Sequence, residues 1–505
     1  MLNKKIKQIK WWQLSQRQRM SPFPNYMSME SVTREMRGVI GYAYEQVVMI
    51  LEEGNFWLFM DKAEHERVGK GVLKKVFKEP AMFVRLAKEQ RRFAKSFYTF
   101  LKKNNKPSAL KKISNKKLSA LHEEYEKRYK QVYSHYFPIL SVENYFFGYL
   151  GDYIKQREPS PAAAAHKIGS LITEPRAMWN RLETADALEL SLKISKNKKW
   201  LACFKKRALS EAVERVKQDS KLNKLINQHA KKWFWITRDY DDPILEFEDF
   251  VERAQNHLKG NPKQKLEKMQ KEDKQYKQDI SDIIKKLKID KKHARLFQTM
   301  REGIYYKELR KSIVSQTLYY YDPILKEIAR RAGLTLRQAR HLKTSEVRPL
   351  LAKRIDMCHE LNGRIKLSVF HAIRGQTIIY IGKQAKEYYD YFVKVDKKVR
   401  ELYGAGVSAG VARGRAKIVI NPDAFHKVKK GDIIITLQAT PIFTRVLSIS
   451  AGLVCDGGPG ITSHPATLAR EAGIPGIIGA RMATKILKDG DMVEVDGNQG
   501  VMRRL

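Results

Sequence analysis

The residues best suited to chemistry lie in one stretch near the C-terminus, GGPGITSHPATLAREAGIPG, residues 457–476. His464 contributes an imidazole, a side chain that can act as a nucleophile near neutral pH. Pro465 follows it at a position where a helix can begin, and Gly473 supplies a helix stop. The spacing therefore predicts a short helix over 465–472, with His464 at its N-terminal end.

That end of a helix carries partial positive charge and unpaired N–H groups, so it attracts anions, phosphate above all. The same field disfavours imidazolium, and we expect the ring of His464 to stay neutral and nucleophilic near pH 7. Thr462 and Ser463 add hydroxyl donors, and the glycines let backbone N–H groups approach a ligand closely. This combination predicts a histidine that takes up a phosphoryl group; the alternative is a packed or capping histidine on a glycine turn.

The elements around His464 read as a separate domain over residues 405–505. About half of the 29 glycines lie after residue 400, where short β-branched runs such as GDIIITLQA and GDMVEVDG alternate with tight turns. A second helical turn is expected within ARMATKILKDG, residues 480–490. We expect a compact, mainly β domain of about 100 residues, with one helix starting directly after His464.

The chain before residue 405 has a helical pattern. Apolar residues recur at three- and four-residue spacing in SMESVTREMRGVIGYAYEQVVMILEEG, residues 28–54, which predicts a helix there. The polar segment 261–292 is expected to be a solvated helix or a linker. Residues 360–382 are expected to hold a small hairpin, with Asn362–Gly363 as its turn.

The sequence thus predicts an α+β multidomain protein, with a large all-helical N-terminal region followed by a C-terminal strand-rich domain. The expected domains are 1–290, helical and binding a substrate or partner; 291–404, helical with the hairpin and a connecting helix; and 405–505, carrying His464.

The charge, hydropathy and cysteine content of the chain argue against several classes of function. The formal net charge of +42 fits either a polyanion-binding surface or lysine-coated helices, but no nucleic-acid reader motif accompanies it, so nucleic acid is not the expected partner. No apolar run reaches membrane-spanning length, and the start has no secretory signal. Three widely separated cysteines argue against a disulfide framework and favour the cytoplasm. Asp356–Glu360 (DMCHE) has metal-ligand residue types without a partner pair, so no metal site is expected.

The stretch GITSHPATLAREAGIPG resembles the phosphohistidine signature of the phosphoenolpyruvate-utilising enzymes, Gly-x-[Thr/Ser]-[Ser/Thr/Cys]-His-x-Ala-x-x-Ala-Arg-Glu-x-Gly-Ile-Pro. The resemblance extends over the last fifth of the chain and implies the swivelling β/β/α domain of that family. It implies that His464 carries the phosphoryl group between two remote sites. Gly460, Thr462, Ser463 and Arg470 are then the expected phosphate-binding residues, with a packing role for Arg470 as the alternative.

Two departures from the family pattern concern the phosphate loop. Pro459 separates the glycines and adds one residue before the histidine, and the element before the loop reads Ala439–Pro441, without a customary hydroxyl. Both changes leave His464 in place.

The helical-then-swivelling order is similar to the C-terminal two domains of rifampin phosphotransferase. We find neither the ATP-grasp domain nor the phosphoenolpyruvate-binding barrel of related enzymes, and no Walker-type loop. The resemblance therefore implies ATP and Mg²⁺ bound through a separate ATP-grasp chain, and an acceptor of unknown identity on the helical region. The alternatives are a non-catalytic binding or regulatory protein that retains the phosphohistidine domain, and a basic nucleic-acid-associated protein.

Overall fold

The computed structural model describes residues 4–17, 20–174, 179–205, 207–238, 240, 243–353, 355–393, 399–439, 441–457 and 463–505. The chain divides into two units, one of residues 1–73, 107–145 and 324–505, the other of residues 74–106 and 146–323. None of the helices in the described ranges is long and apolar enough to span a membrane.

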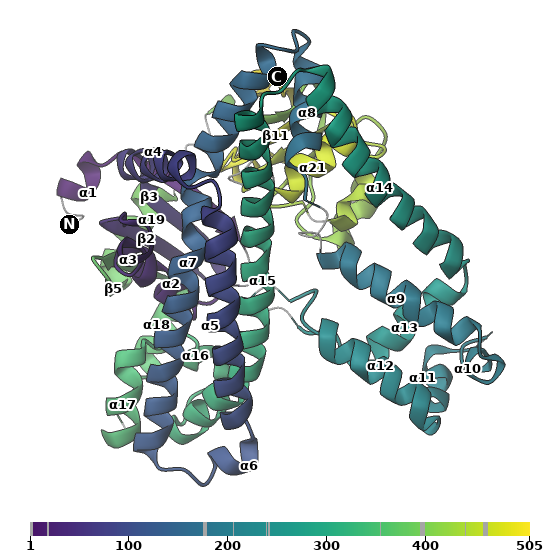
Figure 1. Cartoon of the computed structure of the whole chain (residues 1–505). Helices are drawn as coiled ribbons and strands as arrows, with labels where there is room; N and C mark the ends of the chain where they lie inside the picture. The colour runs from purple at the N-terminus through teal and green to yellow at the C-terminus, as the bar shows by residue number, and fades with distance from the viewer. Residues whose placement is uncertain are drawn as a thin grey trace. The chain divides into compact units, whose positions relative to one another are not determined.

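Helices make up most of the chain before residue 400 (Figure 1). Their bounds are α1 Lys4–Gln8, α2 Asn25–Thr33, α3 Met36–Ile40, α4 Lys62–Lys78, α5 Met82–Asn104, α6 Pro107–Leu110, α7 Asn115–Lys155, α8 Pro161–Ile172, α9 Trp179–Ser195, α10 Lys198–Ala202, α11 Leu209–Gln218, α12 Ser220–Trp233, α13 Phe247–Leu258, α14 Pro262–Lys286, α15 Lys291–Ala332, α16 Leu336–Ala339, α17 Thr344–Lys353, α18 Cys358–Lys366 and α19 Gly382–Phe392. The polar segment 261–292 is helical over most of its length, in agreement with the first of the two expectations, a solvated helix or a linker.

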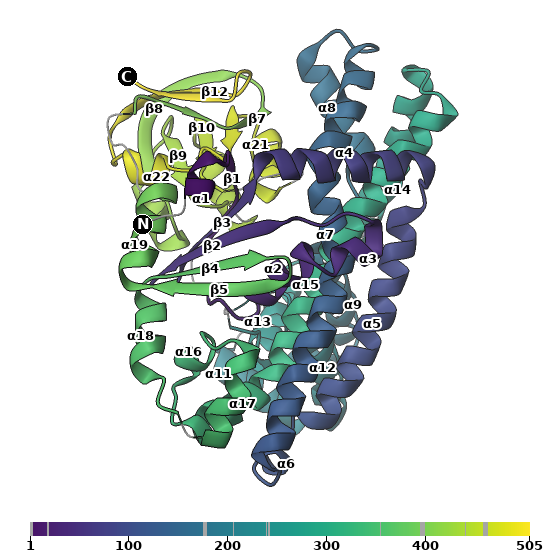
Figure 2. The same cartoon turned by 90° about the vertical axis from the view of Figure 1, so that its left-hand side faces the viewer.

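The first unit contains an antiparallel five-stranded sheet (Figure 2). Its strands are β1 Trp11–Arg17, β2 Gln46–Glu52, β3 Asn55–Asp61, β4 Ser368–Ile373 and β5 Gln376–Ile381, in the order β1-β3-β2-β4-β5. Helix α19 covers one face, where Ala385, Tyr388 and Phe392 pack with side chains of β2, β3 and β4. The sheet thus joins residues 11–61 to residues 368–381, which the expected domains had separated. The expected boundaries near 290 and 404 stay predictions.

The α+β class and the large helical region are confirmed, but that region is not all helix. The helix expected over 28–54 is wrong in its second half, because residues 46–52 form the strand β2. Val47 to Leu51 are all at most 1% exposed, since β2 is hydrogen-bonded to β3 on one side and β4 on the other. A fully buried strand has no alternation of apolar and polar residues, so periodicity does not separate it from a buried helix.

The hairpin expected near residue 370 is present as β4 and β5, but its turn was misplaced. Asn362 and Gly363 lie inside α18, and the strands are joined by Arg374 and Gly375, with φ of 47° and 85°. Two positive φ values are what a two-residue hairpin turn of matching twist requires.

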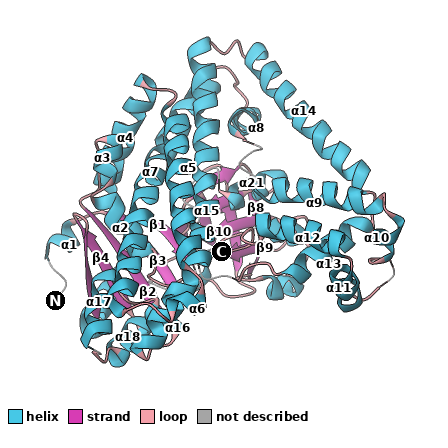
Figure 3. Ribbon diagram, turned by 60° about the horizontal axis from the view of Figure 1, so that its bottom comes forward, coloured by secondary structure: helices cyan, strands magenta, loops and turns pink. Residues whose placement is uncertain are grey.

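Residues 401–505 form the strand-rich part of the first unit (Figure 3). Its strands are β6 Glu401–Tyr403, β7 Ala405–Ser408, β8 Val411–Ile418, β9 Ile433–Thr436, β10 Gly452–Cys455, β11 Gly476–Ile478, β12 Met492–Asp496 and β13 Val501–Arg504. They form one sheet in the order β6-β13-β12-β8-β9-β10-β11-β7. The helical segments are η2 Pro422–Lys427, η3 Pro441–Phe443, α20 Thr444–Leu447, α21 His464–Glu471 and α22 Ala483–Ile486.

The centre of this sheet is parallel: β8, β9, β10 and β11 pair in the same direction. Successive side chains of β10 alternate between two hydrophobic clusters, with Leu453 and Cys455 in one and Val454 in the other. Parallel strands covered on both faces show this period of two. The expected strand-rich character of residues 405–505 is confirmed.

Candidate active site

Helix α21 begins at His464, with Ser463 in extended conformation at its N-cap and Pro465 at the start of its first turn. The first backbone bond of the helix runs from the N–H of Thr467 to the carbonyl of Ser463, at 3.1 Å. At the other end Ile474 N–H donates to Ala469 O and Gly473 N–H to Arg470 O, both at 3.1 Å. Gly473 has a φ of 66°, so this is a Schellman stop. The helix expected over 465–472 is confirmed to within one residue.

The parallel strands fix where this helix starts. The chain leaves β10 at Cys455, passes through Asp456 and Gly457, and enters α21 at His464. Helix α21 then packs on β11, where a Cβ added to Gly476 would lie 2.7 Å from the Cβ of Ala469. The helix N-terminus therefore follows the carboxyl end of a parallel strand, the edge at which open α/β sheets bind ligands.

Asp456 anchors the strand end from which the loop departs. Its side chain is 1% exposed and accepts hydrogen bonds from the N–H groups of Ala483 (2.6 Å) and Thr484 (3.1 Å), and from the Thr484 hydroxyl. Burial raises the pKa of the Asp456 carboxyl to about 6. Because the three donors cap the first turn of α22, Asp456 ties the start of the loop to a segment 28 residues further on.

Backbone hydrogen bonds hold the same strand end. Asp456 N–H donates to Thr436 O and Gly457 N–H to Leu437 O, both at 2.9 Å, while Gly457 O accepts from Gly479 N–H at 3.1 Å. A Cβ at Gly457 would lie 2.9 Å from Leu437 O, so only glycine allows this approach. The segment before the loop is therefore held on both sides by neighbouring parallel strands.

Ser463 is placed next to His464 in the chain and does not act as a conventional cap. A serine at this position normally accepts a bond from the helix N–H groups, but Ser463 makes no side-chain cap bond. Its Oγ is buried and has no hydrogen-bond partner among the residues that the structure describes. A buried hydroxyl without a partner costs about 1–3 kcal/mol, so a ligand oxygen at this helix end would relieve it.

Arg470 lies in the last turn of α21, at the opposite end from His464. Its Nη1 donates to the carbonyl of Val407 in β7 at 3.1 Å, and its Nη2 to Thr467 Oγ1 at 3.4 Å. Six residues along a helix correspond to about 9 Å. These contacts tie the helix to the sheet edge, and the phosphate-binding role of Arg470 stays a prediction beside its packing role.

The other predicted site residues are placed differently. Gly460 and Thr462, like Pro459, lie outside the described residues, so their predicted roles stay predictions, as does the nucleophilic role of His464. Asp456 was not predicted as a support of the site. Its partner Thr484 lies too far along the sequence for any local pattern to link them. Cys455 ends β10 and is fully buried, which raises the pKa of its thiol.

Comparison with known proteins agrees with this geometry. The profile described as "PEP-utilising enzyme, mobile domain" matches residues 428–500. A probable phosphoenolpyruvate synthase of Archaeoglobus fulgidus is 35% identical over 132 residues, 26% of this chain and 17% of that protein. The uncharacterized phosphotransferase YvkC of Bacillus subtilis is 33% identical over 141 residues, again 26% of this chain and 17% of the relative.

The phosphoenolpyruvate synthase of Aeropyrum pernix is 42% identical over 100 residues, 20% of this chain and 12% of that protein. The matched part thus spans less than a fifth of the length of these curated relatives. Among solved structures, aconitase X of Thermococcus kodakaraensis covers 21% of this chain and 99% of that one at 18% identity, with a TM-score of 0.17, too low for an argument about the fold.

The signature around His464, the parallel-sheet domain that presents it and the profile match all concern the same residues. Residues 428–500 of this chain therefore match the mobile domain of the phosphoenolpyruvate-utilising enzyme family.

Proposed function

We propose that this protein is a phosphotransferase component that carries a phosphoryl group on His464. The observation that supports this most is the placement of His464 as the first residue of α21, directly after the uncapped Ser463 and at the carboxyl edge of parallel strands. The family match over residues 428–500 agrees with phosphoryl transfer as the class of reaction. Phosphoenolpyruvate synthase and phosphotransferase are the names of relatives that share this domain.

In the first step an imidazole nitrogen of His464 attacks the phosphorus of a nucleotide-derived donor. The N–P bond forms as the bond to the leaving oxygen breaks, and the leaving oxygen departs with the bonding electrons. Pro465 has no N–H, so the donors of the first turn that lack an intrahelical acceptor are those of His464 and Ala466. These groups and the Ser463 hydroxyl would stabilise charge on the phosphoryl oxygens.

In the second step a hydroxyl or equivalent group of the acceptor attacks phosphorus. The new O–P bond forms, the P–N bond breaks, and the acceptor's proton passes to a base or to solvent. An acceptor held by the helical region, a separate ATP-grasp chain that supplies ATP and Mg²⁺, and a cytoplasmic location complete the proposal. The three cysteines are free, which fits a reducing compartment.

The test of this function is phosphoryl uptake from nucleotide. The chain is incubated with γ- and β-labelled ATP and Mg²⁺, with and without an ATP-grasp chain encoded next to its gene, and acid-labile label is measured on the protein. We expect label on the chain only when the partner is present, and the position of the label in ATP tells which phosphoryl group moves. No acid-labile label under either condition would exclude the function.

Ser463→Ala separates phosphate binding from capping. Because Ser463 makes no cap bond and its buried hydroxyl has no partner among the described residues, the free energy of unfolding should rise, by up to about 1–3 kcal/mol, where a capping serine would lose about 1 kcal/mol. If its hydroxyl contacts the phosphoryl group, the labelling rate of His464 should fall roughly 10- to 100-fold. Labelling at the wild-type rate, or a stability loss of the size of a lost cap, would contradict this role.

A further inference from the structure

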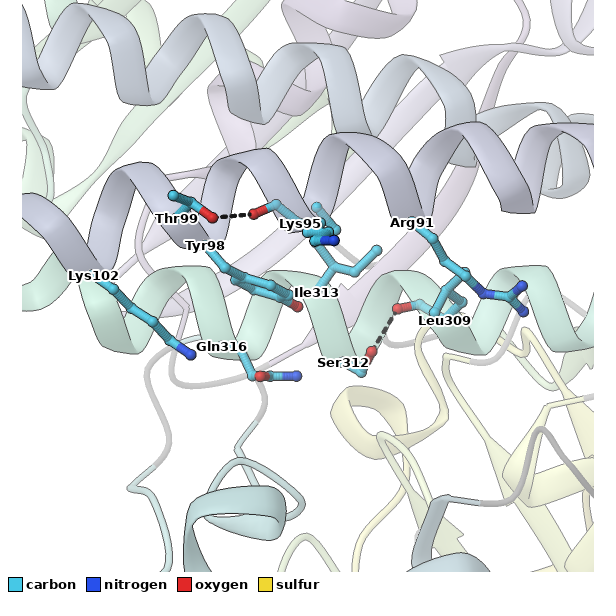
Figure 4. Close-up of a pocket in the computed structure, with 10 residues that line it drawn as sticks. Arg91, Lys95, Tyr98, Thr99, Lys102, Leu309, Ser312, Ile313 and Gln316 are labelled. Carbon is cyan, nitrogen blue, oxygen red and sulfur yellow. Dashed lines mark hydrogen bonds between the residues drawn. The ribbon is translucent and has the colours of Figure 1, made fainter.

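A groove in the second unit lies between α5 and α15, and none of the residues discussed above lines it (Figure 4). Its volume is 410 Å³, near the lower end of the range for small-molecule sites. Seven of its ten lining side chains are polar or charged, namely Arg91, Lys95, Tyr98, Thr99 and Lys102 of α5 and Ser312 and Gln316 of α15. The other three are Ala94 of α5 and Leu309 and Ile313 of α15.

The floor of the groove is apolar. Ala94, Leu309 and Ile313 are at most 7% exposed, and the hydroxyl of Ser312 is satisfied by the carbonyl of Leu309 at 2.9 Å. The ring of Tyr98 lies alongside them between the two helices (Figure 4). A flat or aliphatic body would find van der Waals contact here without leaving a floor group unpaired.

The wall on α5 is positively charged, and its three cations make no ion pair with any of the described residues. Arg91 and Lys95 are one turn apart, a spacing at which like charges destabilise a helix by about 0.2–0.5 kcal/mol, and Lys102 lies two turns beyond Lys95. Residues 90–104 and 309–321 contain no aspartate or glutamate. The start of α5 differs, since Arg85 pairs with Glu79 at 2.8 Å and with Glu89 at 3.6 Å.

Three polar side chains of the groove make no hydrogen bond or ion pair with the described residues, while two others contact neighbouring tyrosines. Within the described residues, the ammonium of Lys95, the hydroxyl of Tyr98 and the amide of Gln316 make no hydrogen bond or ion pair. By contrast, Arg91 donates to the Tyr305 hydroxyl at 2.7 Å, and Lys102 lies 5.0 Å over the ring of Tyr320. Burial raises the pKa of Tyr98, so its hydroxyl stays protonated and able to donate.

We propose that this groove binds a small organic anion, with its phosphate or carboxylate between Lys95 and Lys102 beside the Tyr98 hydroxyl, and its apolar body on Leu309 and Ile313. The charge of such a ligand offsets the repulsion along α5 and supplies acceptors to the unpartnered donors. A neutral ligand of the same shape would leave both costs in place, and a cation would add to the repulsion. The proposal stands apart from the chemistry at His464.

The experiment measures binding of phenyl phosphate to the full chain by calorimetry, without nucleotide. Benzoate serves as the carboxylate arm and benzyl alcohol as the uncharged arm. We expect phenyl phosphate or benzoate to bind, and benzyl alcohol to bind at least about tenfold more weakly, because charge-assisted hydrogen bonds are lost. The tighter of the two anions identifies the head group that the groove prefers. No binding of either anion at millimolar concentration, or equal binding of benzyl alcohol, would overturn the proposal.

Two matched double variants locate the site on α5. Lys95→Gln/Lys102→Gln removes the two lysine charges of the groove, while Lys88→Gln/Lys103→Gln removes two exposed charges of the same helix outside it. We expect the first pair to weaken anion binding at least about tenfold and the second to change it less than about twofold. Equal losses would mean diffuse attraction to a basic chain, and no loss in either would place the anion elsewhere, such as near α21; both results contradict the proposal. Circular dichroism confirms that each variant keeps its helices.

Discussion

His464→Ala is expected to reduce acid-labile phosphate on the chain to background while leaving the fold intact. Without the imidazole no acid-labile N–P bond can form at this position, and the donors of a helix end bind phosphate without forming a bond to it. Alanine suits a first-turn position, so the thermal unfolding temperature should stay at the wild-type value. The measurement is label retained after denaturation at neutral or alkaline pH, compared with label retained in acid.

The matched control is His426→Ala in the same domain. His426 is exposed, and its Nδ1 lies 2.6 Å from the carbonyl oxygen of Asp423 in the short helix η2. This variant should take up label at the wild-type rate. Label that persists in His464→Ala, or that disappears equally from both variants, would show that another residue carries the phosphoryl group.

Asp456→Ala is expected to lower the stability of the mobile domain by about 3 kcal/mol, because three donors of Ala483 and Thr484 lose their buried acceptor. Amide exchange of the full chain, followed by mass spectrometry over residues 476–496, should become roughly 100-fold faster. Asp423→Ala replaces an exposed aspartate of the same domain and should change exchange little. Unchanged protection in Asp456→Ala would contradict the anchoring role.

Titration of Asp456 makes the stability of the domain fall as pH rises. Burial raises the pKa of Asp456 from 3.8 in the unfolded chain to about 6 in the folded one. Between these values the folded state holds more protons, so the free energy of unfolding falls as pH rises from about 4 to about 6, by about 3 kcal/mol in total. Asp456→Asn cannot titrate, and the decline over this window should flatten. A decline of equal size in that variant would assign the pH dependence to another group.

The sequence by itself determined the local features of the site. Proline after His464 and glycine at 473 mark the two ends of α21, because both residues act through their own backbone conformation. The glycine-bounded β-branched runs after residue 405 likewise gave strands, since a short strand with turns at both ends is encoded by neighbouring residues.

Features that depend on residues far apart in the chain are visible only in the folded protein. Residues 46–52 are a strand and not a helix because β4, some 320 residues later, pairs with them. Asp456 is a support of the site because Thr484 folds back onto it. The groove exists because α5 lies beside a stretch of α15 more than 200 residues away, so that unpaired lysines and an apolar floor, each unremarkable in sequence, line one cavity. Whether a residue is buried or paired depends on the residues that pack against it. When those residues are distant in the sequence, a local sequence pattern does not identify them.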